Sequence, residues 1–372
     1  MKPLDAIRVL DFTEGAQGPF AASLLADFGA DVVKIERPDG EMMRRVGPFR
    51  NGLALPVMSI ARGRQATLAL DMKNETDAAT VKRLVAVADV LIQNWKPGTD
   101  EKLGLAFGQV HVLNPNIVYV QASGYGTRGP FGAMGAMDSL SQAMSGWSAL
   151  SGDPAGGGER SRTPVLDFVS AFVTAEAAMV GLAARRRHAR AVWVDTSQMS
   201  AALDAAAPEV AASTHAPLRP AGRRSRYLPL GGWFACVDGG FVSLECHDDE
   251  EVATAARVLG AQAGGSVPEA VEQALARIGS REAVARLRKA GLAAGCVERE
   301  FTPMLFDACP GTVTSFHDED AGEIRHPETP FVMSETPLRA GEPLGRPGRD
   351  NPMIERLIAD WQTRPAQDPQ KD

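Results

Sequence analysis

The sequence predicts an α/β protein with a mainly parallel sheet, followed by a second, smaller α/β unit. Over the first 200 residues, short continuous apolar runs alternate with segments of helical pattern. Strands that are apolar on both faces indicate a parallel sheet covered by helices on each side. The composition then shifts, and residues 204–226 are rich in Ala, Pro and Arg. We therefore expect the chain to divide at this segment.

The strands expected in the large unit are the apolar runs at residues 7–13, 30–36, 66–72, 89–94, 116–123 and 191–196. The helices expected between them cover residues 20–28, 77–88, 138–150 and 167–187. Pro19 suits the first turn of the first helix, and Gly29 is a natural residue to follow its end.

The expected domains are a large domain at 1–203, a linker at 204–226, a small domain at 227–322 and a C-terminal segment at 323–372. In the small domain, strands are expected at 240–246 and 294–298, and helices at 248–259 and 282–290. Residues 327–351 are rich in Pro, Gly and Arg and have no period. They indicate an extended crossing segment, with a short helix expected at 353–361.

Charge and cysteine content argue against several classes of protein. The net charge of −7 argues against a nucleic-acid partner. No apolar run approaches the roughly 20 residues of a membrane helix, and the N-terminus lacks a signal-peptide pattern. Cys236, Cys246, Cys296 and Cys309 show no C-x-x-C spacing and no histidine at metal-ligand spacing. We expect free thiols in a cytoplasmic protein and no bound metal.

A glycine-rich loop, GYGTRG at residues 124–129, follows an expected strand. It fits the G-x-G-x-x-G pattern of dinucleotide sites, in which the turn must open directly into a helix. Here Pro, Phe and Gly follow instead. A nicotinamide site therefore stays the weaker alternative, and we interpret Gly124, Tyr125 and Gly126 as part of an active-site loop. Motifs of P-loop proteins, zinc hydrolases and serine hydrolases are absent from the sequence.

Asp167 lies at the start of a long apolar helix, in the segment TPVLDF. A carboxylate in a first helical turn is favoured by the helix dipole. It can act there as a helix cap. It can also be a nucleophile, because carboxylates form covalent intermediates in acyl chemistry. The residues alone leave both interpretations open.

Basic side chains follow the ends of consecutive expected strands. Arg37, Lys73 and Lys96 hold such positions, and Lys102 lies nearby in the sequence. The C-terminal ends of parallel strands meet at one edge of the sheet, where ligands bind. Any one of these residues could be an ordinary surface residue. Four together favour a phosphate-containing ligand at that edge.

These segments together resemble the class III CoA-transferase family, which includes formyl-CoA and carnitine CoA-transferases and α-methylacyl-CoA racemases. The similarity begins with IRVLDFTEGAQGPF and includes PVLDF. It covers residues 7–40, 66–74, 88–105, 114–131, 137–153 and 164–172, and more weakly 229–246. The resemblance implies an enzyme that moves CoA from an acyl-CoA donor to a carboxylic acid. It also implies a Rossmann-like large domain, a smaller domain and an interlocked homodimer.

The resemblance carries site residues over to this chain. Asp167 falls on the catalytic aspartate, which would carry first an acyl anhydride and then CoA as a thioester. Asp138, Gly231 and Gly232 fall on substrate-site positions. The positions expected to bind coenzyme A, which is the substrate rather than a bound cofactor, are Gly15, Ala16, Arg37, Leu70, Asp71, Met72, Lys73, Asn94, Trp95, Lys96, Lys102, Gly124, Tyr125 and Gly126.

Departures from the family pattern keep two alternatives open. Met137 stands where racemases have a histidine and cannot exchange protons, which disfavours an acyl-CoA racemase or isomerase. Glu14 replaces a histidine of formyl-CoA transferases, and the glycine loop of the small domain is reduced to Gly231 and Gly232. A non-catalytic CoA-binding homologue is therefore the other alternative.

Overall fold

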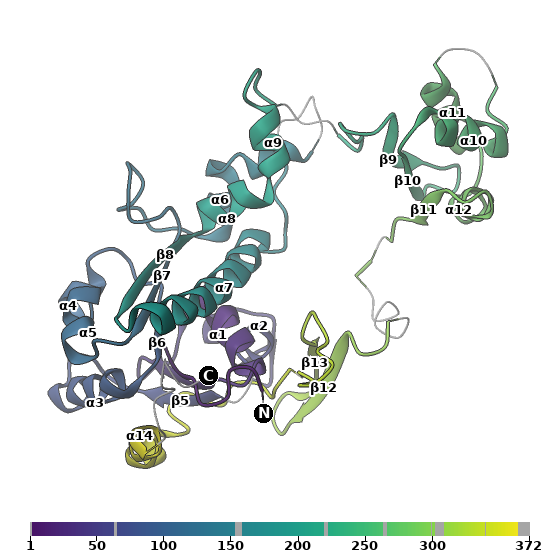
Figure 1. The fold of residues 1–372 in the computed structure, drawn as a ribbon. Helices are drawn as coiled ribbons and strands as arrows, with labels where there is room; N and C mark the ends of the chain where they lie inside the picture. Colours follow the sequence, from purple (N-terminus) through teal and green to yellow (C-terminus); the bar gives the residue numbers. More distant parts are fainter. Residues whose placement is uncertain are drawn as a thin grey trace. The chain divides into compact units, whose positions relative to one another are not determined.

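The computed structural model describes residues 2–62, 65–152, 158–218, 222–262, 266–298, 300–301, 309–338 and 340–363. The chain forms two compact units (Figure 1). Unit 1 comprises Met1–Ser145, Ser161–Ala207 and Phe306–Asp372, and unit 2 comprises Gly146–Arg160 and Pro208–Leu305. The domain boundaries expected from the sequence stay a prediction.

A six-stranded parallel sheet forms the centre of unit 1. Its strands are β1 (Arg8–Asp11), β2 (Asp31–Glu36), β5 (Gln65–Ala69), β6 (Val90–Gln93), β7 (Val118–Ser123) and β8 (Val192–Ser197). They lie in the order β5-β2-β1-β6-β7-β8, and every neighbouring pair is parallel. Renumbered along the chain within this sheet, the order is 3-2-1-4-5-6, that of Rossmann-type sheets. The predicted α/β fold with a parallel central sheet is confirmed.

The two faces of the sheet carry separate apolar cores, because successive side chains of a strand point to opposite faces. Val9, Val32 and Val90 belong to one core, with α1 and α7. Leu10 and Leu91 belong to the other, with α3, α5 and α14 (Figure 1). These helices are α1 (Gln17–Asp27), α3 (Glu75–Val87), α5 (Phe107–Leu113), α7 (Val165–His188) and α14 (Ile354–Thr363).

Several elements end earlier than the sequence predicts, because turns begin at their C-terminal ends. β5 ends at Ala69 rather than Met72, and the Asp71 carboxylate accepts a hydrogen bond from the Lys73 N–H at 2.9 Å. The helix expected at 138–150 is α6 (Asp138–Met144), followed by a separate 3₁₀ turn, η2 (Trp147–Leu150). Gly146 separates them at a φ of +79°, which a helix cannot contain.

Helix α7 is the one helix in the described ranges that is long and apolar enough to cross a membrane, by length and composition. Packing covers part of its apolar surface, since it lies against α1, β7 and β8, while Phe172 and Val180 remain exposed. A Cβ atom on Gly181 would lie 2.5 Å from Val118 Cγ1. The glycine therefore brings the helix backbone close to β7.

The C-terminal part of unit 1 contains a hairpin that the sequence analysis missed. β12 (Val313–Asp318) and β13 (Gly322–Pro327) pair antiparallel, and Ile324 packs in a small core with α2 (Leu55–Ile60). Further along, the Asn351 side chain bonds to the backbone of Ala69 on edge strand β5, at 2.9 and 3.0 Å. The exposed edge of the sheet is thereby partly covered.

The remaining short elements of unit 1 are η1 (Met42–Arg45), β3 (Phe49–Arg50), β4 (Leu53–Ala54), α4 (Thr99–Leu103) and η3 (Asn351–Met353).

In its described part, unit 2 contains an antiparallel three-stranded sheet in the order β11-β10-β9, on which α10, α11 and α12 pack. The helices pack on the sheet around a core that includes Phe234, Leu244 and Leu287. The elements are β9 (Leu230–Ala235), β10 (Phe241–Cys246), α10 (Asp249–Leu259), α11 (Val267–Leu275), α12 (Ser280–Lys289) and β11 (Ala293–Cys296). Strand β9 and helix α11 were not predicted. Before them come α8 (Gln198–Ala205) and α9 (Ala207–Ala212).

A buried carboxylate ties three segments together at the N-terminal edge of the parallel sheet. Asp89 pairs with Arg8 at 2.7 Å and with Arg185, in the last turn of α7, at 3.0 Å. All three side chains are less than 10% exposed. Arg8 also donates to the carbonyl of Trp361 at 2.8 Å, which attaches α14.

Asp89→Ala should destabilise unit 1 by about 3–5 kcal/mol, because it leaves two buried guanidinium groups without their carboxylate. Urea unfolding followed by tryptophan fluorescence measures the change. Glu355→Ala, which removes the exposed Arg83–Glu355 pair, is the control and should leave the midpoint almost unchanged. Equal midpoints for the two variants would show that the Asp89 cluster does not hold the sheet.

Candidate functional site

The predicted coenzyme A positions of unit 1 lie mostly at one edge of the sheet. Five neighbouring strands end at Asp11, Glu36, Ala69, Gln93 and Ser123. Each is followed directly, or within a few residues, by one of the predicted segments. Since the strands are parallel, these segments share the C-terminal edge, where open α/β sheets bind ligands.

The strand order reverses between β1 and β6, and the loops after these strands are bonded to each other. Asn94 accepts the Glu14 N–H at 2.9 Å and donates to the Glu14 carbonyl at 2.7 Å. Trp95 packs against Phe12 in a tilted arrangement, with ring centroids 5.2 Å apart. Asn94 and Trp95 therefore fix the shape of the loop that carries Gly15 and Ala16.

A buried ion pair between strands β1 and β2 also anchors this loop. Lys34 Nζ lies 3.0 Å from Asp11 Oδ2, and both side chains are fully buried. Asp11 also accepts the Thr13 N–H at 2.8 Å. The Gly15 N–H donates to Glu41 at 3.1 Å, and burial raises the pKa of this carboxyl group. Sequence analysis missed Glu41, which lies on an irregular segment.

Four basic residues supply positive charge at or near this edge. Lys73, Lys96 and Lys102 are exposed and make no ion pair within the described ranges. Arg37 is also exposed but pairs with Glu14, Nε to Oε1, at 3.2 Å. The three lysines are thus available to an anion, whereas Arg37 must share its charge with Glu14.

The glycine-rich loop does not open into a helix, because α6 begins only at Asp138. Gly124 leaves no room for a side chain, since a Cβ there would lie 2.0 Å from Ala136 Cβ. Gly126 has a φ of +82° and donates its N–H to Ser123 at 2.9 Å. The loop therefore lacks the strand–turn–helix geometry of a dinucleotide site.

Asp138 caps helix α7 from a neighbouring helix. Its Oδ1 accepts the N–H groups of Leu166 at 2.8 Å and Asp167 at 3.2 Å. Pro164, at the N-cap position, provides no side-chain cap of its own. Gln142 donates to the other oxygen of Asp138 at 2.6 Å. The capping role left open for Asp167 thus belongs to Asp138.

The Asp167 carboxylate is half-buried and stands next to Asp138. Burial raises the pKa of Asp167 to about 7, and the charge of Asp138 adds to the rise. The carboxyl group is therefore close to half ionised at neutral pH. A carboxylate with a pKa near 7 is more basic than an ordinary one, and such perturbed groups are frequent at functional sites.

Gln198 is a site residue that the sequence analysis missed. It begins α8, is 4% exposed, and its Nε2 donates to Asp167 Oδ1. Its Oε1 accepts the hydroxyl of buried Ser141. Nothing in the local sequence signals this contact, since it joins residues on three different helices.

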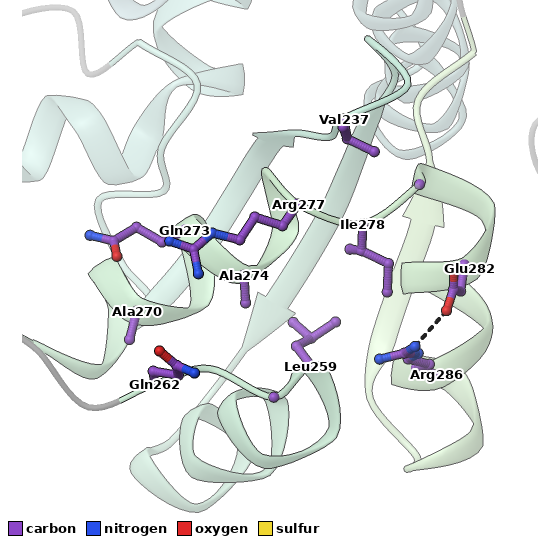
Figure 2. A pocket seen from close by; sticks show the side chains of 12 residues that line it. Val237, Leu259, Gln262, Ala270, Gln273, Ala274, Arg277, Ile278, Glu282 and Arg286 are labelled. Carbon is purple, nitrogen blue, oxygen red and sulfur yellow. Dashed lines mark hydrogen bonds and ion pairs between the residues drawn. The ribbon is translucent and has the colours of Figure 1, made fainter.

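Gly231 and Gly232 lie in unit 2, on strand β9, opposite Glu245 and Leu244 of β10. A Cβ on Gly232 would lie 2.0 Å from the Arg223 carbonyl oxygen, so the backbone itself fills the space beside this residue. Unit 2 also has a pocket of about 580 Å³ between α10, α11 and α12. Its polar lining includes Arg277 and Arg286, the latter paired with Glu282 (Figure 2). None of the predicted site residues lines it.

No cluster of three or more potential metal ligands occurs in the part of the chain that the structure describes. The expected absence of a bound metal stays a prediction. The carboxylates of Asp138 and Asp167 are instead satisfied by backbone N–H groups and by two glutamine amides.

Asp138→Asn should lower the pKa of Asp167 below 7, because it removes a neighbouring negative charge while keeping an oxygen to cap the helix. At pH 7 more of Asp167 would then be ionised. Difference infrared titration, with Asp167→Asn as the blank, measures this pKa. An unchanged pKa would mean that burial alone sets it.

Comparisons with known proteins identify the family of the chain. A family model described as CoA-transferase family III matches residues 4–351. Succinyl-CoA--D-citramalate CoA-transferase of Chloroflexus aurantiacus is 31% identical, over 90% of this chain and 89% of that protein. Acetyl-CoA:oxalate CoA-transferase of Acetobacter aceti is 32% identical, over 73% of this chain and 70% of that protein.

The fold is also that of solved relatives. A CAIB/BAIF family protein from Brucella suis matches with a TM-score of 0.82 at 23% identity, covering 96% of this chain and 99% of that one. Rv3272 from Mycobacterium tuberculosis matches with a TM-score of 0.80 at 25% identity, covering 95% and 99%. With the family model spanning nearly the whole sequence, the chain belongs to CoA-transferase family III.

Proposed function

We propose that Asp167 is the residue through which this protein transfers CoA between an acyl-CoA and a carboxylic acid. The reaction class follows from the family, so acyl-CoA and a carboxylate are its substrates. The observation that supports a catalytic role for Asp167 is that another residue, Asp138, caps helix α7. The side chain of Asp167 is therefore not needed as the cap. A half-buried carboxylate with a pKa near 7 is then left for chemistry.

The transfer would proceed through two anhydrides and one thioester. An oxygen of Asp167 attacks the thioester carbon, and CoA leaves as its thiolate. The thiolate then attacks Cγ of Asp167, which releases the donor acid and leaves aspartyl-CoA. The acceptor carboxylate attacks Cγ in turn and displaces the thiolate. The thiolate finally attacks the acceptor carbonyl, which forms the new acyl-CoA and frees Asp167.

The raised pKa of Asp167 suits this sequence of steps. A more basic carboxylate is a stronger nucleophile, provided that enough of it is ionised. The position of Asp167 in the first turn of α7 favours the ionised form through the helix dipole. Partial burial also limits the water that could hydrolyse the anhydride or the thioester.

We propose that the C-terminal edge of the parallel sheet binds coenzyme A. The exposed lysines Lys73, Lys96 and Lys102 would contact its phosphates, since none of them has an ion-pair partner in the described ranges. Asn94 and Trp95 would support the Gly15–Ala16 loop around the pantetheine arm. In unit 2, Gly231 and Gly232 remain proposed substrate residues.

Succinyl-CoA is the donor we propose to test first. Relatives named as succinyl-CoA-dependent transferases match this chain at 30–31% identity over 90% or more of its length. Acceptor acids for the same test are D-citramalate, L-malate, glutarate and oxalate, which the names of the relatives contain.

We also propose the interlocked homodimer and the cytoplasmic location expected from the resemblance and from the cysteine content. Apolar side chains of α7 that remain partly exposed, among them Phe172 at 45% and Val180 at 60%, support a partner subunit, because exposed apolar surface favours association. The four free cysteines are consistent with a reducing compartment.

Asp167→Ala should reduce CoA transfer by at least about 10³-fold, the scale expected for loss of a covalent nucleophile. Mass spectrometry of the wild type quenched during turnover should show CoA joined to the peptide that contains Asp167. The variant should bind CoA but show no such adduct. Full transferase activity of Asp167→Ala would refute the mechanism.

Lys96→Ala should raise the KM for acyl-CoA by about 3–10-fold with little change in kcat, because a phosphate contact contributes to binding alone. The effect should diminish at high salt. Lys82→Ala, an exposed lysine on α3 away from the strand ends, is the matched control. A similar KM change in both variants would argue for a general charge effect instead of a contact.

A further inference from the structure

The amide of Gln198 is held in one orientation against Asp167. An ionised carboxylate can only accept, so the NH₂ group of Gln198 faces Asp167 and donates to Oδ1. The hydroxyl of Ser141, which is fully buried, donates to Gln198 Oε1 and so satisfies the other end of the amide in this orientation. Ser141 comes from α6, Gln198 from α8 and Asp167 from α7. Residues from three helices thus place an N–H donor of Gln198 at Oδ1 of Asp167.

The contact leaves Asp167 Oδ2 as the oxygen free to attack a thioester. The acyl group would then be joined through Oδ2, and Oδ1 would become the carbonyl oxygen of the aspartyl anhydride. The same Oδ1 is the carbonyl oxygen of aspartyl-CoA. Gln198 would face this oxygen through every covalent state of Asp167.

In two of the four transfer steps the atom attacked is Cγ of Asp167 itself. The CoA thiolate attacks it to displace the donor acid, and the acceptor carboxylate attacks it to displace the thiolate. In both steps the electron pair of the carbonyl bond moves to Oδ1, which becomes a tetrahedral oxyanion. A donor already placed at that oxygen lowers the barrier, because its interaction strengthens as charge develops.

We propose that Gln198 is the oxyanion donor for the two steps at the carbonyl carbon of Asp167, and that Ser141 is the positioning residue that orients it. This inference rests on the proposed function of Asp167. Attack of Asp167 on the substrate thioester places the charge on an oxygen of the substrate instead. Gln198 therefore acts in the step that forms aspartyl-CoA and in the step that consumes it. It does not act in the attack of Asp167 on the donor thioester.

Discharge of aspartyl-CoA by hydroxylamine isolates one of these steps. The enzyme is loaded with succinyl-CoA, separated from free nucleotide and mixed with hydroxylamine, and loss of the adduct is followed by mass spectrometry. Gln198→Leu should discharge about 10²–10³-fold more slowly, the cost of removing one oxyanion donor. Ser141→Ala should have a smaller effect in the same direction. Asp204→Asn, exposed on the same helix, is the control and should match the wild type.

Gln198→Glu gives a signature that a merely structural role would not produce. At each pH, the rate of aspartyl-CoA discharge by this variant is divided by the wild-type rate. This ratio should be low when the introduced glutamate is ionised and should rise as the pH falls, because only the protonated glutamate has a hydrogen to donate. In aspartyl-CoA the carboxyl group of Asp167 is part of the thioester and cannot ionise. Recovery at low pH therefore cannot come from titration of Asp167.

The outcomes separate the two proposals. Absence of an Asp167 adduct in the wild type overturns the proposed function and, with it, the role of Gln198. An adduct that Gln198→Leu discharges at the wild-type rate overturns the role of Gln198 alone. Thermal unfolding and CoA binding identify a misfolded variant. If Gln198→Leu misfolds, the pH dependence of Gln198→Glu decides: recovery supports the inference, and a pH-independent ratio overturns it.

Discussion

Helix α7 is held at both ends by buried carboxylates that come from other elements. At its N-terminus Asp138 accepts two backbone N–H groups, and at its C-terminus Arg185 pairs with Asp89. Between them, Gly181 allows the helix to lie close against β7. The rest of unit 1 depends on this arrangement, since the helix covers one face of the sheet and carries Asp167 at the opposite edge from the Asp89 cluster.

The two carboxylates act differently because their partners differ. Asp89 is paired with two guanidinium groups, which more than offset its charge, and its role is stability. Asp138 is matched only by N–H groups and one amide. Its negative charge remains available to act on Asp167, whose pKa it helps to raise. Near the N-terminal edge of the sheet, the carboxylate of Asp89 is thus paired with cations, whereas the charge of Asp138, at the other edge, acts on Asp167.

Local sequence patterns predicted the sheet, and they predicted that the proposed coenzyme A positions lie at one edge of it, because both follow from short-range rules. Apolar runs such as 89–94 become buried strands, and the side chains after them meet at one edge. The hairpin at 313–327 was missed, since its strands carry polar residues such as Ser315, His317 and Arg325. Gln198 was missed for another reason: its contacts with Ser141 and Asp167 span 57 and 31 residues. The catalytic role proposed for Asp167 came from the family resemblance, because the residues alone left both a helix cap and a nucleophile open.

The contact with Gln198 also has a consequence for the electrostatics of Asp167. A donated N–H stabilises the ionised carboxylate, whereas burial and Asp138 favour the protonated one. The repulsion from Asp138 acts only on the free carboxylate, whereas the hydrogen bond from Gln198 can act on both the free and the acylated forms of Asp167. Once Asp167 is acylated it has no charge, so the repulsion from Asp138 is relieved, while the hydrogen bond to Oδ1 can remain. Burial and Asp138 thus raise the energy of the free carboxylate relative to the covalent intermediates, while the donor stays at Oδ1, where its interaction strengthens as each tetrahedral oxyanion forms; an isolated helix-cap aspartate would provide neither.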